Sequence, residues 1–150
     1  MKTLLMISLG LSFTFSNVTS LVYDALKGDS LTLVDTMILK IEKGERNSSN
    51  IAYKGALLMK KASFMKVPRR KIVLFKEGHQ LLEEEIVNNP ENVEYRFLRL
   101  VIQENAPKIL KYNMNLEEDK KLVLENFSKL PTNLQEIIKE YALTSTQINF

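Results

Sequence analysis

The chain has 150 residues, of which 45% are hydrophobic and 26% are charged, a composition typical of one ordinary globular domain. It contains no cysteine, which excludes disulfides, thiol catalysis and cysteine-bound metals. The formal net charge of +3 is too small to indicate a nucleic-acid partner.

The first 20 residues have the order of a secretory signal peptide. Lys2 supplies a basic start, an uncharged and mostly apolar run covers residues 4–15, and small polar residues follow up to Ser20. The apolar run is shorter than the roughly 20 residues that a membrane-spanning helix needs. The sequence therefore predicts residues 1–20 as a signal peptide, export to the periplasm or the exterior, and no membrane span. An amphipathic or buried first helix is the alternative.

Six segments further along have apolar residues at every third or fourth position, which predicts six helices. Residues 21–27 add a short leading helix to this prediction. The clearest boundary is the polar turn at residues 88–92, where Asn89 can cap the next helix and Pro90 suits its first position. The six predicted helices cover approximately residues 31–43, 51–65, 70–87, 91–105, 115–130 and 132–143.

No segment shows the alternation of polar and apolar residues that marks a half-buried strand, so the predicted fold class is all-α. Each apolar stripe covers one side of its helix and must be hidden by another helix. The shortest connections pair the helices as three antiparallel hairpins, at residues 31–65, 71–105 and 116–143. We expect one domain over residues 21–143 and a frayed tail over residues 144–150.

Part of the chain resembles the tetratricopeptide repeat. The resemblance rests on Pro90 at the end of one helix pair, on Tyr95, Leu98 and Ile102 at the start of the next, and on Gly55 at the small position of a first helix. It covers about residues 48–105 and implies hairpins stacked as a short right-handed superhelix. More loosely, the whole chain resembles small exported helical proteins of bacteria, which implies architecture and export and no catalytic residue.

One side of the fourth predicted helix and the connector after it carry residue types that often anchor interfaces. Stacked hairpins present such a helix on their concave face, so we predict a site there for another protein or a peptide. The alternative places Tyr95 in the core and pairs the arginines with Glu91 or Glu94. The candidate interaction residues are Tyr95, Arg96, Arg99 and Tyr112.

A basic segment lies between the second and third predicted helices. It is a candidate contact for an anion, such as a lipid headgroup, a polysaccharide or an acidic peptide. A helix end and a solvated loop explain the same residues without a ligand. Apart from Phe64, no aromatic residue is interleaved for base stacking, so nucleic acid is not expected. The six residues are Lys60, Lys61, Lys66, Arg69, Arg70 and Lys71.

The remaining titratable residues do not form a recognisable catalytic or metal motif. His79, the only histidine, and Glu83 could face one metal ion, but a zinc site needs three or four ligands. The acidic runs at residues 83–85 and 117–119 spread around their helices and predict solvated faces. There is no phosphate-binding glycine loop. We therefore predict no enzyme activity, no cofactor and no resident metal.

The leading hypothesis is an exported interaction module or accessory subunit, with self-association left open. The alternative is a carrier that holds a lipid or another amphiphile between its helices. The residues that would line such a carrier are Met59, Phe64, Met65, Phe75 and Phe97.

Overall fold

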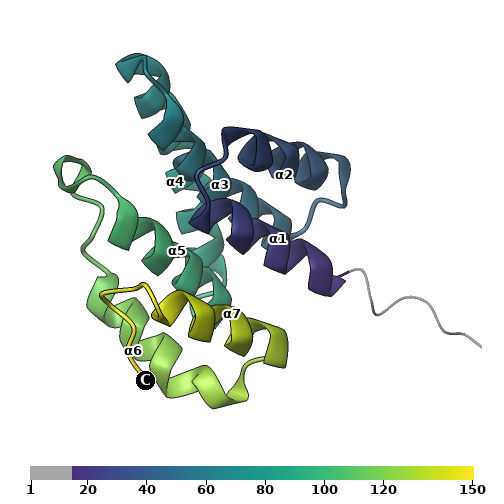
Figure 1. The fold of residues 1–150 in the computed structure, drawn as a ribbon, viewed down its shortest axis with the longest axis vertical. Helices are drawn as coiled ribbons and strands as arrows, with labels where there is room; N and C mark the ends of the chain where they lie inside the picture. Colours follow the sequence, from purple (N-terminus) through teal and green to yellow (C-terminus); the bar gives the residue numbers. More distant parts are fainter. Residues whose placement is uncertain (1–14) are drawn as a thin grey trace, which may run out of the picture.

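The computed structural model describes residues 15–150, and within this range the chain consists of helices joined by short loops, with no strand (Figure 1). The predicted all-α class is confirmed. Two short 3₁₀ turns, at Lys108–Leu110 and Phe127–Lys129, accompany seven α-helices in this part of the chain. These helices are α1 (Phe15–Lys27), α2 (Leu31–Lys43), α3 (Ser48–Phe64), α4 (Pro68–Asn88), α5 (Val93–Asn105), α6 (Leu116–Asn126) and α7 (Thr132–Ala142).

Helix α1 begins earlier than the leading helix that the sequence predicts. Val22 and Ala25 lie in the core, and the Thr19 hydroxyl lies 3.0 Å from the Tyr53 hydroxyl of α3. Cleavage after Ser20 would remove residues 15–20, the first part of this helix. Residues 1–14 lie outside the described range, so the signal peptide stays a prediction.

Side-chain caps start several helices, though not always the predicted ones. Ser30 caps α2 by accepting a hydrogen bond from the backbone N–H of Leu33. Asn92, not Asn89, caps α5, with its side-chain oxygen 3.1 Å from the Tyr95 nitrogen. Asn89 is instead the C-cap of α4, because its backbone N–H still bonds to the Glu85 carbonyl. The chain therefore needs three more residues of turn before the next helix begins.

The closest helix pair is α3 with α4, and two glycines explain why. Gly55 and Gly78 face each other across the pair. A Cβ atom placed on Gly55 would lie 2.8 Å from the Gly78 carbonyl oxygen, closer than real Cβ contacts. The two backbones are therefore in direct contact, an approach that only the absence of side chains allows.

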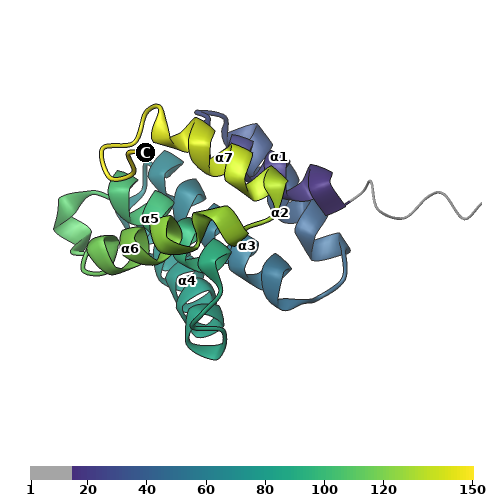
Figure 2. The same ribbon diagram turned by 90° about the horizontal axis from the view of Figure 1, so that it is seen from below.

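The predicted pairing of helices into hairpins is only partly correct. The pair at residues 31–65 is present, since α2 packs on α3 with ion pairs between Lys61 and Asp35 and between Lys54 and Glu42. The other extensive contacts are α3 with α4 and α5 with α6, which shifts the pairing by one helix. α6 and α7 contact each other little, and α7 packs beside α1 instead (Figure 2). The right-handed superhelix stays a prediction.

Helix α5 occupies the centre of the core. Phe97 is fully buried, and its ring lies 5.3 Å from that of Tyr23 in α1 and 5.5 Å from that of Tyr141 in α7. This placement explains why α7 returns to α1: both helices cover the same side of α5. Within residues 15–150, none of the helices combines the length and the apolarity needed to cross a bilayer.

The last seven residues differ from the frayed tail that the sequence predicts. Ile148 is fully buried, and the Glu104 carboxylate accepts hydrogen bonds from Ser145 and Thr146. Periodicity could not reveal this contact, because the segment has no regular structure and is held by one carboxylate on another helix.

Candidate functional site

A buried network of charged side chains ties α4, α5 and α6 together. The Arg99 guanidinium of α5 donates two hydrogen bonds to the fully buried Asp119 carboxylate of α6, at 2.6 and 2.7 Å. A third Arg99 N–H donates to Glu83 of α4 at 2.8 Å. Burial disfavours the charged guanidinium, but the hydrogen bonds and charges of both carboxylates outweigh burial and raise the pKa of Arg99. Arg99 is therefore a fixed cation that sets how three helices meet.

The same network fixes the connector between α5 and α6. The Tyr112 hydroxyl donates a 2.6 Å hydrogen bond to the second oxygen of Glu83. Burial and the Glu83 carboxylate raise the pKa of Tyr112, so the hydroxyl stays protonated and remains a donor. Lys111, just before it, has a φ of 49°, a left-handed conformation that costs a non-glycine residue about 1–2 kcal/mol. Strain of this kind often accompanies functional loops.

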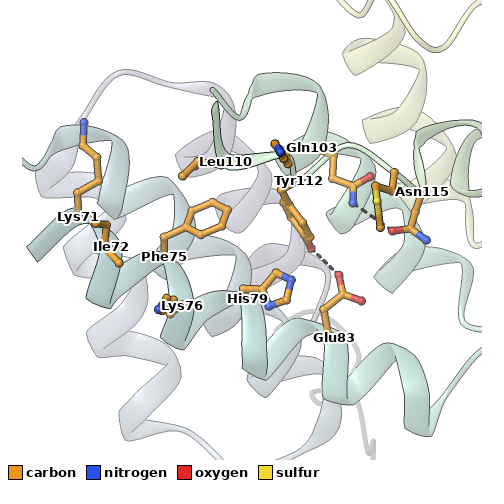
Figure 3. Close-up of a pocket in the computed structure, with 12 residues that line it drawn as sticks. Lys71, Ile72, Phe75, Lys76, His79, Glu83, Gln103, Leu110, Tyr112 and Asn115 are labelled. Atoms are coloured by element: carbon orange, nitrogen blue, oxygen red, sulfur yellow. Dashed lines mark hydrogen bonds between the residues drawn. The ribbon is translucent and has the colours of Figure 1, made fainter. Parts of the chain in front are cut away.

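These contacts leave a groove between the N-terminal half of α4 and the connector, which we call the connector groove (Figure 3). Its volume is about 570 Å³, within the range of small-ligand and peptide-side-chain sites. The Tyr112 ring packs edge-on against Phe75 and His79, with centroids 5.7 and 4.8 Å away. The apolar lining residues are Ile72, Phe75, Leu110, Tyr112 and Met114.

The charged lining of the connector groove is mainly positive. Lys71, Lys76 and Lys111 line the groove and make no ion pair among the described residues, whereas both oxygens of its one carboxylate, Glu83, already accept hydrogen bonds. At the end towards α6, Gln103 is buried, and its side-chain oxygen has no hydrogen-bond partner in the described part of the chain. The groove therefore combines an apolar floor, cationic edges and an unused polar group.

The predicted interaction residues are brought together, but they do not form an exposed surface. Tyr95, Arg99 and Tyr112 are buried, and Arg96 is mostly covered, with bonds to Asp119 and Glu118. The alternative interpretation is correct for Tyr95, which belongs to the core. It is wrong about the arginine partners, which are acidic residues of α4 and α6 rather than Glu91 or Glu94. Among the four, only Tyr112 lines the connector groove.

The basic segment gathers around the turn between α3 and α4. Lys66, Arg69 and Arg70 are exposed, whereas Lys60, Lys61 and Lys71 are half-buried. Lys61 pairs with Asp35 of α2, and Lys60 lies over the Phe64 ring. The six residues thus share one end of a helix pair, as the sequence order implies, and differ in what already contacts them.

The candidate metal pair does not gather further ligands. His79 packs against aromatic rings, while Glu83 is engaged by Arg99 and Tyr112. Within the described residues there is no group of three or more histidine, aspartate or glutamate side chains that could hold a metal ion.

The acidic runs are only in part the solvated faces that the sequence predicts. Asp119 is fully buried and Glu85 is buried, whereas Glu84, Glu117 and Glu118 are exposed. Asp119 lies in the first turn of α6, where the helix dipole favours an acidic residue even when it is exposed. The sequence therefore provided no reason to expect that Asp119 is the buried partner of Arg99.

The proposed carrier residues do not enclose a common cavity. Phe97 and Met59 are buried in the core, and of the five residues only Phe75 lines the connector groove. The groove has a weak signal in the sequence, namely the apolar residues Ile109, Leu110 and Met114 in an otherwise polar connector.

Comparisons with known proteins do not place the chain in a family. No family model matches it, and neither the curated proteins nor the solved structures gave a match. The function is therefore argued from the connector groove and its surroundings.

Proposed function

We propose that the protein is an exported, non-enzymatic interaction module that holds an apolar segment of a partner protein in the connector groove. The observation that carries the proposal is an open apolar groove bordered by strongly exposed apolar side chains. Met114 in its wall is 88% exposed, and Ile109 in the same connector is 87% exposed. Apolar side chains that gather on a surface in this way are typical of interaction sites.

The one carboxylate of the groove is better placed for binding than for catalysis. A general acid or base needs a free atom facing the substrate, but Glu83 uses both carboxylate oxygens for Arg99 and Tyr112. These bonds hold α4 against the connector and so maintain the shape of the groove. We infer that Glu83 and Arg99 position the site rather than react in it.

The cationic edges indicate the chemistry of the partner segment. Lys71, Lys76 and Lys111 would attract carboxylates, so the segment should carry aspartate or glutamate beside one or two bulky apolar side chains. A carrier of free amphiphiles is less well supported, because the groove is open to solvent and, of the five proposed carrier residues, only Phe75 lines it.

Site-specific photo-cross-linking tests the proposal. A benzophenone amino acid at Met114 probes the groove, and one at Leu143, which is also strongly exposed but lies after α7, is the matched control. We expect protein adducts from position 114 only, at partner segments rich in both apolar and acidic residues. Phe75→Asp in the groove floor should abolish them.

Two results would overturn the proposal. One is the same set of adducts at both positions, which would indicate non-specific contact. The other is an amphiphile, detected by native mass spectrometry of the purified protein and lost in the Phe75→Asp variant, with no protein adduct at position 114. That result would make the carrier alternative correct.

A further inference from the structure

The positive charge of the chain is concentrated at the end of α3 and in the first half of α4, where Lys71 and Lys76 also border the connector groove. Residues 60–76 contain seven basic residues and no acidic residue, which leaves 14 basic and 18 acidic residues for the rest of the chain. The rest of the chain is therefore net negative although the whole is net positive. An asymmetry of this size orients a protein in an electric field and concentrates it at anionic surfaces.

This charge lies at the extreme end of the molecule. The turn between α3 and α4 stands at one end of the longest axis, beyond the other helices (Figure 1). We call residues 60–73 the hairpin tip. Among the described residues, Lys66, Arg69 and Arg70 make no ion pair. Their charges are therefore available to a partner that approaches the tip end-on.

Exposed aliphatic side chains accompany these cations. Val67, in the turn itself, is 52% exposed, and Val73, one turn into α4, is 57% exposed. A hollow of about 450 Å³ lies beside them, with Arg69 and Arg70 next to apolar walls that include Leu74. Guanidinium groups beside an aliphatic surface suit a ligand with a phosphate and a hydrocarbon part.

We propose that the hairpin tip docks on the surface of an anionic lipid bilayer. Val67 and Val73 enter the interface between headgroups and acyl chains, while Lys66, Arg69 and Arg70 bind headgroup phosphates. Nucleic acid fits less well, because the exposed apolar side chains of the tip are aliphatic and cannot stack on bases. The inference goes beyond the proposed function, since Val67, Arg69 and Arg70 do not line the connector groove.

The absence of tryptophan from the sequence allows a direct test. Val67→Trp places a single tryptophan at the tip of the full chain. Val87→Trp is the control, because Val87 is 76% exposed at the opposite end of α4. With vesicles of phosphatidylcholine and phosphatidylglycerol, we expect a blue shift and protection from an aqueous quencher for position 67 and not for position 87. Phosphatidylcholine vesicles should change neither spectrum.

Vesicle co-sedimentation with charge-reversed variants tests the electrostatic part. At about 0.1 M salt, Arg69→Glu combined with Arg70→Glu should reduce binding to the anionic vesicles by about tenfold or more. Lys121→Glu combined with Lys129→Glu makes the same change of charge at exposed residues of α6 and of the 3₁₀ turn after it, and should reduce binding less than about twofold. Circular dichroism verifies that each variant is folded.

Several outcomes would overturn the inference. Equal losses in the two double variants would show attraction by net charge alone. Unchanged binding in the Arg69→Glu, Arg70→Glu variant would place the contact elsewhere in the chain. Retention on a DNA oligonucleotide without vesicle binding would identify the tip as a nucleic-acid site. None of these results bears on the cross-links expected at Met114.

Discussion

The two closest helix pairs are held together by opposite means. In α3–α4, Gly55 and Gly78 bring two backbones into direct contact with no side chain between them. In α5–α6, the pair depends on the buried charges of Arg99 and Asp119. The first contact has no room for an added atom, and the second has no tolerance for a lost partner.

This difference separates two kinds of sensitivity within one small domain. Backbone contact gains dispersion energy without desolvating a charge, but an added methyl group must displace a helix. A buried ion pair has already been removed from water, so the loss of one partner leaves an unpaired charge in the interior. Substitutions in the two pairs should therefore destabilise the protein for different reasons.

The largest effect is expected from Asp119→Ala. The Arg99 guanidinium would stay buried without its main partner, which should lower the free energy of unfolding by about 3–5 kcal/mol. Urea unfolding followed by circular dichroism measures the change. Glu118→Ala is the control, because Glu118 also contacts Arg96 but is exposed, and it should cost less than about 1 kcal/mol. Similar losses in both variants would contradict a buried, energetically important pair.

Gly78→Ala should have the next largest effect. Its new methyl group would overlap the Gly55 carbonyl and lie 2.9 Å from the Met59 backbone nitrogen, so α3 and α4 must separate. We expect a loss of about 1–3 kcal/mol, measured by the same urea titration. Gly44→Ala, where a methyl group would meet its nearest atom at 3.4 Å, should change stability by no more than about 0.5 kcal/mol. Equal effects would show that the helices do not meet at the glycines.

Removal of the side-chain caps should affect both helix pairs equally. Asn47 caps α3 with a 2.9 Å bond, and Asn92 caps α5 with a 3.1 Å bond. Asn47→Ala and Asn92→Ala should each cost about 1 kcal/mol, because each leaves one backbone N–H without its partner. Thermal unfolding of both variants measures this. A much larger loss in one variant would mean that its asparagine does more than cap a helix.

The smallest effect concerns the pH dependence of stability, through the Glu104 carboxylate that holds residues 144–150. Burial opposes ionisation of Glu104, but hydrogen bonds from Tyr141, Ser145 and Thr146 outweigh burial and lower its pKa from the ordinary 4.5. The folded state therefore gains stability above the pKa of the unfolded chain and loses it as the pH falls through the lower, folded pKa. Glu104→Gln should cost under about 1 kcal/mol at neutral pH and flatten this acid dependence.

Glu94 is the control for the sign of that prediction. Burial raises the pKa of Glu94 despite the hydrogen bond from Tyr53, so its ionisation costs stability as the pH rises above the unfolded value. Glu94→Gln should therefore remove the loss of folding stability that Glu94 causes near neutral pH, whereas Glu104→Gln removes the loss of stability that occurs at acid pH. Urea midpoints at about pH 7 and about pH 3.5 distinguish the two variants. If the urea midpoints of both variants changed with pH in the same way, that result would contradict the opposite pKa shifts of Glu94 and Glu104.

Local patterns were sufficient to predict the fold class and the approximate extent of six helices. Apolar spacing and a cap such as Ser30 act within a few residues, so they can be read from neighbouring positions. The same reasoning failed at Asn89 and Asn92, where two asparagines in one turn offer alternative caps. Which one is used depends on where α4 ends.

The candidate site could be predicted much less well. Tyr112 was identified as a functional candidate, but its partners Phe75, His79 and Glu83 belong to a helix that ends more than 20 residues earlier. Arg99 was identified as an interface residue because arginine is a residue type that often anchors interfaces. Its burial depends on Asp119, which only the packing of α6 brings into reach.

The order of residues is enough to make this chain helical, to place its turns and to concentrate its positive charge between α3 and α4, because each property depends on near neighbours. Which helices become partners is a property of the folded molecule. The backbones of α3 and α4 touch at Gly55 and Gly78, Arg99 and Asp119 form a buried ion pair, and α1 and α7 both pack on Phe97 of α5. The connector groove exists only as a result of these contacts, because its two walls come from segments that no local pattern links.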